Sequence, residues 1–272
     1  MADGVVAAAL VPGLPHLLAG EPAPSWKGLA EAARTLGERL RSARVDTLLW
    51  MSTQWFTVLG HQFQVDPHPR GTRVDENWYG YDFGRADYDL RVDAELAQRW
   101  ADETEAAGLQ ARRTRYDGFP IDTGTVVTAA LLDPHRQASL AMVSCNLYAG
   151  AEAMERIGAA GARAAGILGR RVAVVAVSGL SSGLIQRWIN PDEDAVDPGH
   201  DRWNRHVLDL LAAGRLDEVM RLREQYAAEA QVDSQLRALA FLAGTGALSG
   251  PAEVLEYGPV WGTGAAVIGW TD

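Results

Sequence analysis

The chain has 272 residues, of which 47% are apolar and 22% charged, as in an ordinary globular protein with a sizeable core. Its 25 basic and 35 acidic residues give a formal net charge of −10, which excludes an electrostatic attraction to nucleic acid or to an anionic membrane. A single cysteine, Cys145, excludes an intrachain disulfide and a thiolate metal cluster, and its apolar neighbours predict a buried thiol. No basic signal-peptide segment opens the chain, so we expect a cytoplasmic protein.

The first half of the chain alternates predicted strands and helices. Apolar residues recur at helical spacing from Leu29 to Leu40, and Ser25 is the expected N-cap of that helix. Residues 66–81 are polar, aromatic and turn-rich, a long excursion of the kind that often carries function. In chain order, we expect strands at residues 5–11, 45–51, 58–65 and 87–92 (an edge strand), a helix at 94–107 and a strand at 110–115.

The second half continues the same alternation. The expected elements are a helix from Asp122 to Leu132, a strand at 140–145, a helix at 151–168, a strand at 171–178, three helical stretches between His200 and Leu242, and strands at 254–257 and 265–270. Strands that alternate with helices predict a three-layer α/β/α fold around a mixed, largely parallel sheet. No linker divides the chain, so we expect residues 1–272 to form a single domain.

A candidate nucleophile follows the strand expected at residues 171–178. The segment Gly179-Leu-Ser-Ser-Gly183 fits a pattern in which a tight turn after a strand exposes the central serine, here Ser181. A hydrolase of that type needs a later histidine, and only His200 and His206 follow, both close in sequence to the serine. A small-residue turn without catalysis explains the segment more often, and a serine hydrolase using Ser181 stays as an alternative.

Metal ligation by histidine is the second candidate chemistry. The six histidines form no His-x-x-x-His pair or other close ligand motif. His16 follows the first expected strand and His61 comes shortly after the second, so the two could meet at one edge of a sheet. Isolated histidines more often make structural hydrogen bonds than bind a metal.

Several short motifs, read together, resemble one family. The motifs are Val11-Pro-Gly-Leu-Pro-His16, Ser52-Thr-Gln-Trp55, Val74-Asp-Glu-Asn-Trp-Tyr79, Tyr116-Asp-Gly-Phe-Pro-Ile-Asp-Thr-Gly124, Ala176-Val-Ser-Gly-Leu-Ser181 and Tyr257-Gly-Pro-Val-Trp-Gly-Thr-Gly264. In this order and spacing they resemble the class III extradiol ring-cleavage dioxygenases, the family of the protocatechuate 4,5-dioxygenase β chain. The resemblance covers nearly the whole chain and is greatest to the α-type subunits of the members that cleave 2-aminophenol.

The resemblance implies that this chain has lost the histidines of an iron site. Active members hold Fe(II) with two histidines and one carboxylate, which leaves positions open for substrate and O₂. Gly13 matches the first iron histidine, and His16 matches the second histidine of that loop motif. Gln54, followed by Trp55, matches the second iron histidine. Glycine has no ligating side chain, and an amide oxygen is a weak ligand for Fe(II).

The resemblance also matches two further residues of this chain to functional positions of the family. Ser182 matches the histidine that active members use as acid and base. Asp233 matches the iron carboxylate, within a helix that we expect over residues 229–239. The six positions from Gly13 to Asp233 are thus expected to form a vestigial pocket, with no catalytic residue and no metal in this chain.

The resemblance therefore implies a noncatalytic, structural or regulatory α-type subunit of a heteromeric dioxygenase. A homologous catalytic β subunit would hold Fe(II) in an α2β2 hetero-oligomer that cleaves an aminophenol- or catechol-type ring with O₂. One alternative is an active dioxygenase whose iron site is rebuilt from His16, His61 and Asp233. Another is a module that binds an aromatic molecule in the vestigial pocket without turnover.

Tryptophans offer candidate contacts to such a partner. The chain has nine, which is many for its length. Trp26, Trp78, Trp188 and Trp203 fall in expected loops or near the ends of expected elements. Aromatic side chains at such places often anchor protein interfaces, and ordinary core packing explains most tryptophans equally well.

Overall fold

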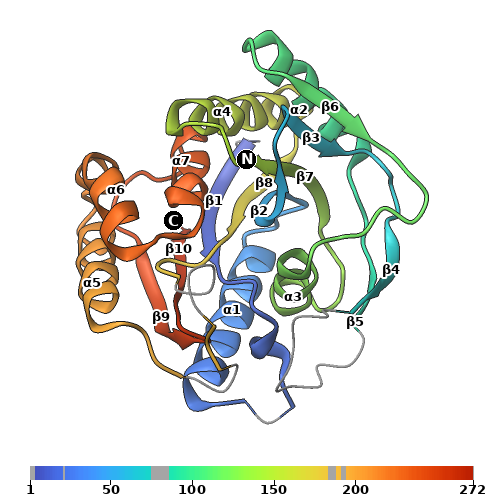
Figure 1. Ribbon diagram of the computed structural model, residues 1–272. Helices are drawn as coiled ribbons and strands as arrows, with labels where there is room; N and C mark the ends of the chain where they lie inside the picture. Colours follow the sequence, from blue (N-terminus) through green and yellow to red (C-terminus); the bar gives the residue numbers. More distant parts are fainter. Residues whose placement is uncertain (1–3, 21, 75–85, 183–187, 191–193, 272) are drawn as a thin grey trace.

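The computed structural model describes residues 4–20, 22–74, 86–182, 188–190 and 194–271 (Figure 1). Its centre is an eight-stranded sheet with the strand order β6-β3-β7-β2-β8-β1-β10-β9. The strands are β1 Gly4–Val11, β2 Thr47–Thr57, β3 His61–Gln64, β6 Ala111–Thr114, β7 Ser139–Asn146, β8 Arg171–Val177, β9 Glu253–Val260 and β10 Thr263–Thr271. The helices are α1 Pro24–Ser42, α2 Ala94–Ala106, α3 Thr123–Leu132, α4 Ala151–Ile167, α5 Pro198–Ala212, α6 Leu216–Ala230 and α7 Arg237–Gly244, with short 3₁₀ turns η1 Pro15–Leu18 and η2 Asp233–Leu236.

The predicted mixed, largely parallel sheet is confirmed. Strands β7, β2, β8 and β1 are parallel neighbours at its centre. Strand β3 runs antiparallel to β7 and parallel to β6, while β10 runs antiparallel to β1 and β9. Residues 172–177 of β8 are all fully buried, as expected for a strand covered by helices on both sides of the sheet.

Helices cover both faces of this sheet, which confirms the three-layer α/β/α prediction (Figure 1). Alternate residues of β1 face opposite sides, since successive side chains of a strand point in opposite directions. Ala7 and Ala9 belong to the apolar core under α1 and α3. Ala8 and Leu10 belong to the second core, under α2, α4 and α7.

Two expectations about local structure are wrong. Helix α1 begins at Pro24 with Ala23 as N-cap, because the fixed φ of proline suits the first helical position. Ser25 lies inside the helix, where its hydroxyl donates to Asp194 Oδ1 at 2.7 Å. The expected edge strand at 87–92 is instead β5 (Ala86–Asp89), which pairs with β4 (Arg70–Arg73) in a separate two-stranded sheet.

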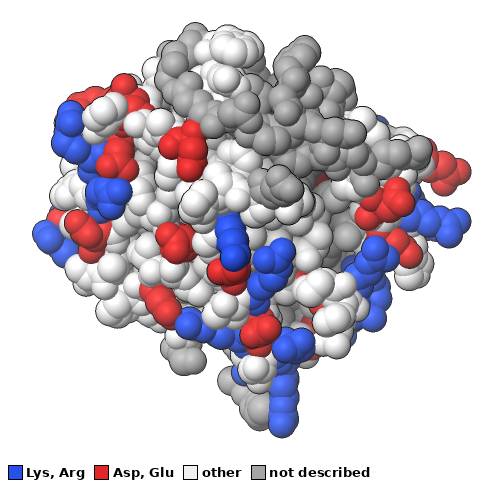
Figure 2. All heavy atoms as spheres, turned by 90° about the horizontal axis from the view of Figure 1, so that it is seen from below, with Lys and Arg blue, Asp and Glu red and all other residues white. Residues whose placement is uncertain are grey.

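The surface charge and the helices of the described residues bear on the requirements of nucleic-acid and membrane binding. Figure 2 shows basic and acidic side chains interspersed over the described part of the face seen from below, without a broad basic surface there. Within the described ranges, no helix combines the length and apolar character that a membrane crossing requires.

Helices α4 and α7 are in backbone contact through two glycines. A Cβ atom built on Gly158 of α4 would lie 2.1 Å from the carbonyl oxygen of Phe241 in α7. A Cβ atom on Gly244 of α7 would lie 1.9 Å from the carbonyl oxygen of Glu155 in α4. Both distances are far below contact, so the close packing of these helices requires glycine.

We expect Gly158→Ala to lower the free energy of unfolding by about 1–3 kcal/mol, because the added methyl group forces the helices apart. This loss overrides the ~1 kcal/mol by which alanine favours a helix over glycine. The matched control is Gly166→Ala in the same helix, where a Cβ atom meets nothing within 4 Å, and it should stabilise the protein. Urea denaturation checks both, and equal stabilisation by both variants would contradict the close contact.

Candidate functional site

The positions that match the family's iron site lie where β1, β2 and β8 end. Gly13 follows β1 by two residues, and Ser182 follows β8 by five. Strand β2 continues to Thr57, beyond its expected end, but its pairing with β7 is interrupted between Ser52 and Phe56. Gln54 lies in this irregularity, and such bulges are common beside functional sites. The carboxyl ends of parallel strands are where ligands usually bind in α/β proteins.

The side chain of Gln54 connects two of the surrounding loops. Its Nε2 donates to the carbonyl oxygen of Gly13 at 3.1 Å, and its Oε1 accepts from the backbone N–H of Gly124 at 2.8 Å. The two positions that the resemblance matches to iron histidines are therefore neighbours here, joined by a hydrogen bond. Because the amide is both donor and acceptor, one side chain satisfies both loops.

Space at Gly13 excludes any side chain. A Cβ atom at this position would lie 2.5 Å from Gly124 Cα and 2.5 Å from Val177 Cγ1. The clash with Gly124 is with backbone, so it cannot be relieved by a rotamer change. An imidazole at position 13 thus requires movement of the N-terminus of α3.

The carboxylate of Asp233 is held by hydrogen-bond donors. Its Oδ2 accepts from Thr53 Oγ1 at 2.8 Å, from Ser178 Oγ at 3.1 Å and from Gly179 N–H at 3.0 Å. Its Oδ1 accepts from Ser234 Oγ at 3.0 Å. These donors occupy lone pairs that a metal ion would otherwise use.

The expected helix over residues 229–239 is wrong, since α6 ends at Ala230 and the chain turns through left-handed conformations. Ser234, Gln235 and Leu236 have φ of 47°, 53° and 59°. Left-handed residues other than glycine are strained and cannot continue a right-handed helix. Arg237 stabilises this turn, because its guanidinium donates to the carbonyl of Ser234 at 2.8 Å.

The two serines after β8 are in different environments. Ser182 donates its backbone N–H to Gln231 O at 3.0 Å, and the residue is half-buried. Ser181 is fully buried, and its hydroxyl accepts from Asn204 Nδ2 at 2.8 Å. A serine in a nucleophile elbow is exposed beside a histidine, so these contacts argue against the hydrolase alternative. Gly183, the end of the quoted pattern, lies outside the described residues.

The two candidate ligand histidines are not brought together. His16 is buried in the core, where its ring lies 4.7 Å from the Trp26 ring and 5.3 Å from the Trp261 ring. His61 is buried in β3, hydrogen-bonded to the backbone of Ser144. Among the residues that the structure describes, no three His, Cys, Asp or Glu side chains are grouped to hold a metal ion. Within the described residues, His16, His61 and Asp233 are therefore not grouped as a rebuilt iron centre would require.

The residues present do not fit an Fe(II) centre at the family position. Gly13 has no side chain, both groups of the Gln54 amide are engaged, and Asp233 is surrounded by donors. Trp55 is half-buried beside them, with its ring 6.0 Å from that of Phe119. That the six family positions form a vestigial pocket stays a prediction.

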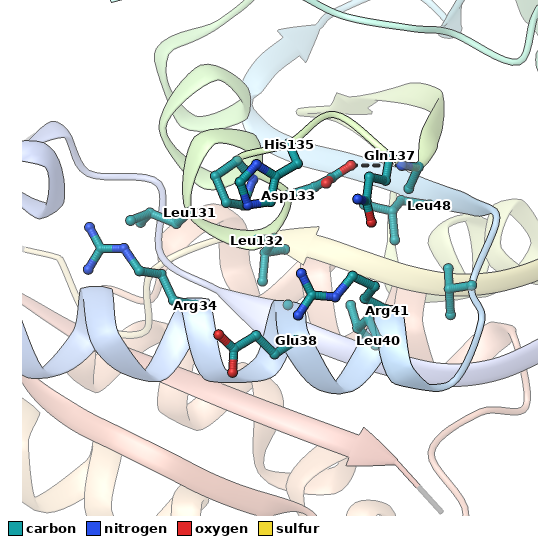
Figure 3. A pocket seen from close by; sticks show the side chains of 14 residues that line it. Arg34, Glu38, Leu40, Arg41, Leu48, Leu131, Leu132, Asp133, His135 and Gln137 are labelled. Carbon is teal, nitrogen blue, oxygen red and sulfur yellow. Dashed lines mark hydrogen bonds between the residues drawn. The ribbon is translucent and has the colours of Figure 1, made fainter.

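A cavity of about 150 Å³ lies elsewhere, at the seam between α1 and the end of α3 (Figure 3). Leu48, Leu131 and Leu132 contribute apolar side chains, and Arg34 and Arg41 extend from α1 at its rim. None of the family positions lines this cavity. The cavity is therefore separate from the candidate site.

The buried thiol of Cys145 is not a nucleophile. The residue is fully buried in β7, as predicted from its apolar neighbours. Burial, assisted by the negative charge of Asp233, raises the pKa of the thiol to about 12. The reactive thiolate is therefore scarce at neutral pH.

Sequence reasoning missed the residues that hold the site together. Thr53 and Ser178 were inside quoted motifs, yet nothing marked them as partners of Asp233. Gly124 was also in a motif, but its contact with Gly13 depends on tertiary packing. No sequence signal indicated Arg237, whose buried guanidinium binds backbone carbonyls.

Comparison with known proteins identifies the family. Residues 10–267 match the family model described as the catalytic LigB subunit of aromatic ring-opening dioxygenase. The chain is 36% identical to the 2-aminophenol 1,6-dioxygenase alpha subunit of a Pseudomonas species, over 97% of this chain and 98% of that one. It is 28% identical to the beta subunit of that enzyme, over 99% of this chain and 95% of that one. The crystal structure of an uncharacterized Escherichia coli K12 protein shares the fold, with a TM-score of 0.69 and 14% identity over 97% of this chain and 99% of that one.

We expect Gln54→Glu to lower the free energy of unfolding at pH 7 by about 0.5–1 kcal/mol, because a carboxylate cannot donate to Gly13 O and water compensates part of the loss at this exposed residue. The introduced carboxyl regains a donor when protonated, so its pKa is higher in the folded than in the unfolded protein. The deficit relative to the unmodified protein should therefore shrink as pH falls through that folded pKa. Urea denaturation at pH 7 and pH 4 checks this, with the exposed Gln98→Glu in α2 as control.

His61 should give the protein an acid-sensitive stability. Burial lowers the pKa of its imidazole below the usual 6.5, although the hydrogen bond to Ser144 opposes this shift. The unfolded chain therefore binds a proton first, and stability is lost as pH falls below about 6.5. We expect His61→Gln to flatten the stability profile between pH 7 and pH 5, while the control His68→Gln leaves it unchanged. Identical slopes for both variants would contradict a neutral buried His61.

Proposed function

The chain belongs to the LigB family of class III extradiol ring-cleavage dioxygenases, as the motifs predicted, and on this premise we propose that it is a noncatalytic α-type subunit of a heteromeric member. In the proposed enzyme, a homologous β-type subunit holds Fe(II) and cleaves an aminophenol- or catechol-type ring with O₂. The present chain holds no metal and serves a structural or regulatory role in an α2β2 complex.

The relatives support the choice of an α-type subunit. The chain matches both subunits of the Pseudomonas enzyme nearly end to end, with the higher identity to the alpha subunit. Two homologous subunits in one enzyme imply that an ancestral catalytic fold was duplicated. A duplicate can then lose its own chemistry while keeping the surfaces that bind its partner.

One observation carries the proposal that this chain is noncatalytic. Gln54 lies at a family ligand position, and its amide is committed to the Gly13 carbonyl and the Gly124 N–H. Fe(II) of this kind is held by imidazole nitrogens and a carboxylate, with positions left open for substrate and O₂. Here the Gln54 side chain instead links the Gly13 and Gly124 loops by hydrogen bonds. This arrangement favours a role in assembly over one in ring cleavage.

The carboxylate at the third family position is also engaged by protein groups. Asp233 is acidic, as the resemblance predicts for an iron ligand, but its Oδ2 accepts hydrogen bonds from Thr53, Ser178 and Gly179. One carboxylate with no imidazole beside it does not hold Fe(II) against water. In this proposal the hydrogen bonds keep the turn in place, as metal ligation would in a catalytic relative.

The proposal is tested by measuring iron in the chain purified alone, after anaerobic loading with Fe(II) and desalting. We expect less than about one tenth of an equivalent of iron and no ring cleavage of 2-aminophenol or catechol, because the site lacks the ligands that bind Fe(II) tightly. Mixing with the β-type subunit from the same source should give an iron-containing, active complex. Stoichiometric iron with ring cleavage by this chain alone would overturn the proposal.

The control for the iron test is the β-type subunit purified and loaded in the same way. It should retain iron, which shows that the loading and desalting steps preserve a family metal site. If the β-type subunit alone has the stability and activity of the mixture, this chain is not a subunit of that enzyme.

A further inference from the structure

Two adjoining turns carry half of the exposed large apolar side chains of the described residues. Of ten such side chains, five lie at the end of β2 or in the turns that follow β2 and β7. We call these five the twin-turn surface; they are Phe56, Val58, Leu59, Leu147 and Tyr148. Leu59 is 83% exposed and Tyr148 81% exposed, so both side chains are almost wholly in solvent. Large apolar side chains gathered at one place mark an interaction site, whereas isolated ones are common on any surface.

Hydrogen bonds hold the two turns against each other. The Leu147 N–H donates to Thr57 O at 2.9 Å, and Asn146 Nδ2 donates to Gly60 O at 3.0 Å. The hydroxyl of Thr57 also donates to Gly60 O, at 2.9 Å, and Tyr148 N–H donates to Asn146 Oδ1 at 2.8 Å. The surface is therefore preorganised, and a partner that binds it loses little conformational entropy in ordering it.

The same surface is tied to the candidate site through Arg237. Its guanidinium donates to Leu147 O at 2.5 Å and to Ala149 O at 2.6 Å, on the turn after β7. It also donates to Ser234 O at 2.8 Å, in the strained turn that begins at Asp233. The buried side chain of Arg237 therefore joins the turn after β7 to the turn at Asp233. The position of the exposed surface depends on the conformation of the chain at Asp233.

We propose that the twin-turn surface is where the homologous β-type subunit binds. The inference rests on the proposed function and deepens it by naming the contact surface. The five residues are between 38% and 83% exposed, so together they present roughly a few hundred Å², the scale of the largest apolar patch on a typical monomer. A patch of that size can form the apolar centre of the roughly 800 Å² that each partner buries in a stable complex, and Phe56 and Tyr148 supply aromatic anchors.

The β-type subunit is favoured over a second copy of this chain. A relative of that type is 28% identical over 99% of this chain and 95% of its own, which implies a common fold. Two homologous subunits can then meet through corresponding surfaces around a pseudo-twofold axis. A second copy of this chain would bring a further formal charge of −10, and this repulsion opposes self-association.

The tryptophans considered earlier do not supply this surface. Trp26 is buried in the core under α1, and the indole of Trp203 donates to Glu229 Oε2 at 2.9 Å. Trp78 lies outside the described residues. Trp188 is exposed but lies outside both turns. The proposed anchors are therefore residues to which the sequence pattern gave no role.

The test uses the full chain with the double substitution Leu59→Asp and Tyr148→Asp, mixed with the β-type subunit from the same source. We expect the dissociation constant of the complex, measured by sedimentation or calorimetry, to rise about 100-fold or more, because two anchors are lost and charges enter the interface. The control is Ile167→Asp, which places one such charge on an exposed apolar residue at the end of α4, and each single variant of the pair is compared with it. The control should bind as the unmodified chain does.

Each isolated variant should be folded as the unmodified chain is, since the substituted side chains are exposed. Circular dichroism and the melting temperature check this. If the unmodified chain does not bind the β-type subunit, the proposed function fails. If it binds and the double variant binds equally well, only the surface assignment fails. If the unmodified chain forms a homodimer that the double variant disrupts, the surface joins two copies and the choice of partner is wrong.

Discussion

The contact between the backbones of Gly13 and Gly124 is the constraint on which the candidate site depends. It brings the loop after β1 against the first turn of α3, so closely that a Cβ atom at Gly13 would lie 2.5 Å from Gly124 Cα. The Gln54 amide then spans the two loops with one donated and one accepted hydrogen bond. In the proposed noncatalytic subunit, the absence of a ligand at position 13 is therefore imposed by the backbone as well as by the residue type.

The strained turn from Asp233 to Leu236 is held by its surroundings. Successive left-handed residues are strained, and they persist only where the surrounding contacts determine them. Those contacts are the donors around Asp233 and the guanidinium of Arg237. Because Arg237 also binds the turn after β7, the same side chain links the candidate site to an outer surface.

The regular elements could be predicted from the sequence, while the arrangement of the site could not. Buried strands such as β8 and the helix begun at Asp122 follow from apolar runs and a side-chain cap, which are local signals. Ser25 was wrongly predicted as an N-cap, because Pro24 occupies the first helical position and Ala23 is the N-cap. The turn at Asp233 was predicted as helix because its left-handed residues are ordinary helix formers, and only tertiary contacts impose their conformation.

The position of β1 in the sheet has a consequence for the order of events during synthesis. Strand β1 is made before both of its neighbours, β8 (Arg171–Val177) and β10 (Thr263–Thr271). Several strands and helices separate β1 from β8 in the chain, and β10 follows later still. The pairings of β1 cannot form until these strands are made, so β1 must be kept from wrong pairing until then. Such long-range pairing makes folding slow, and a chain truncated before β10 leaves the edge of a central strand open to aggregation.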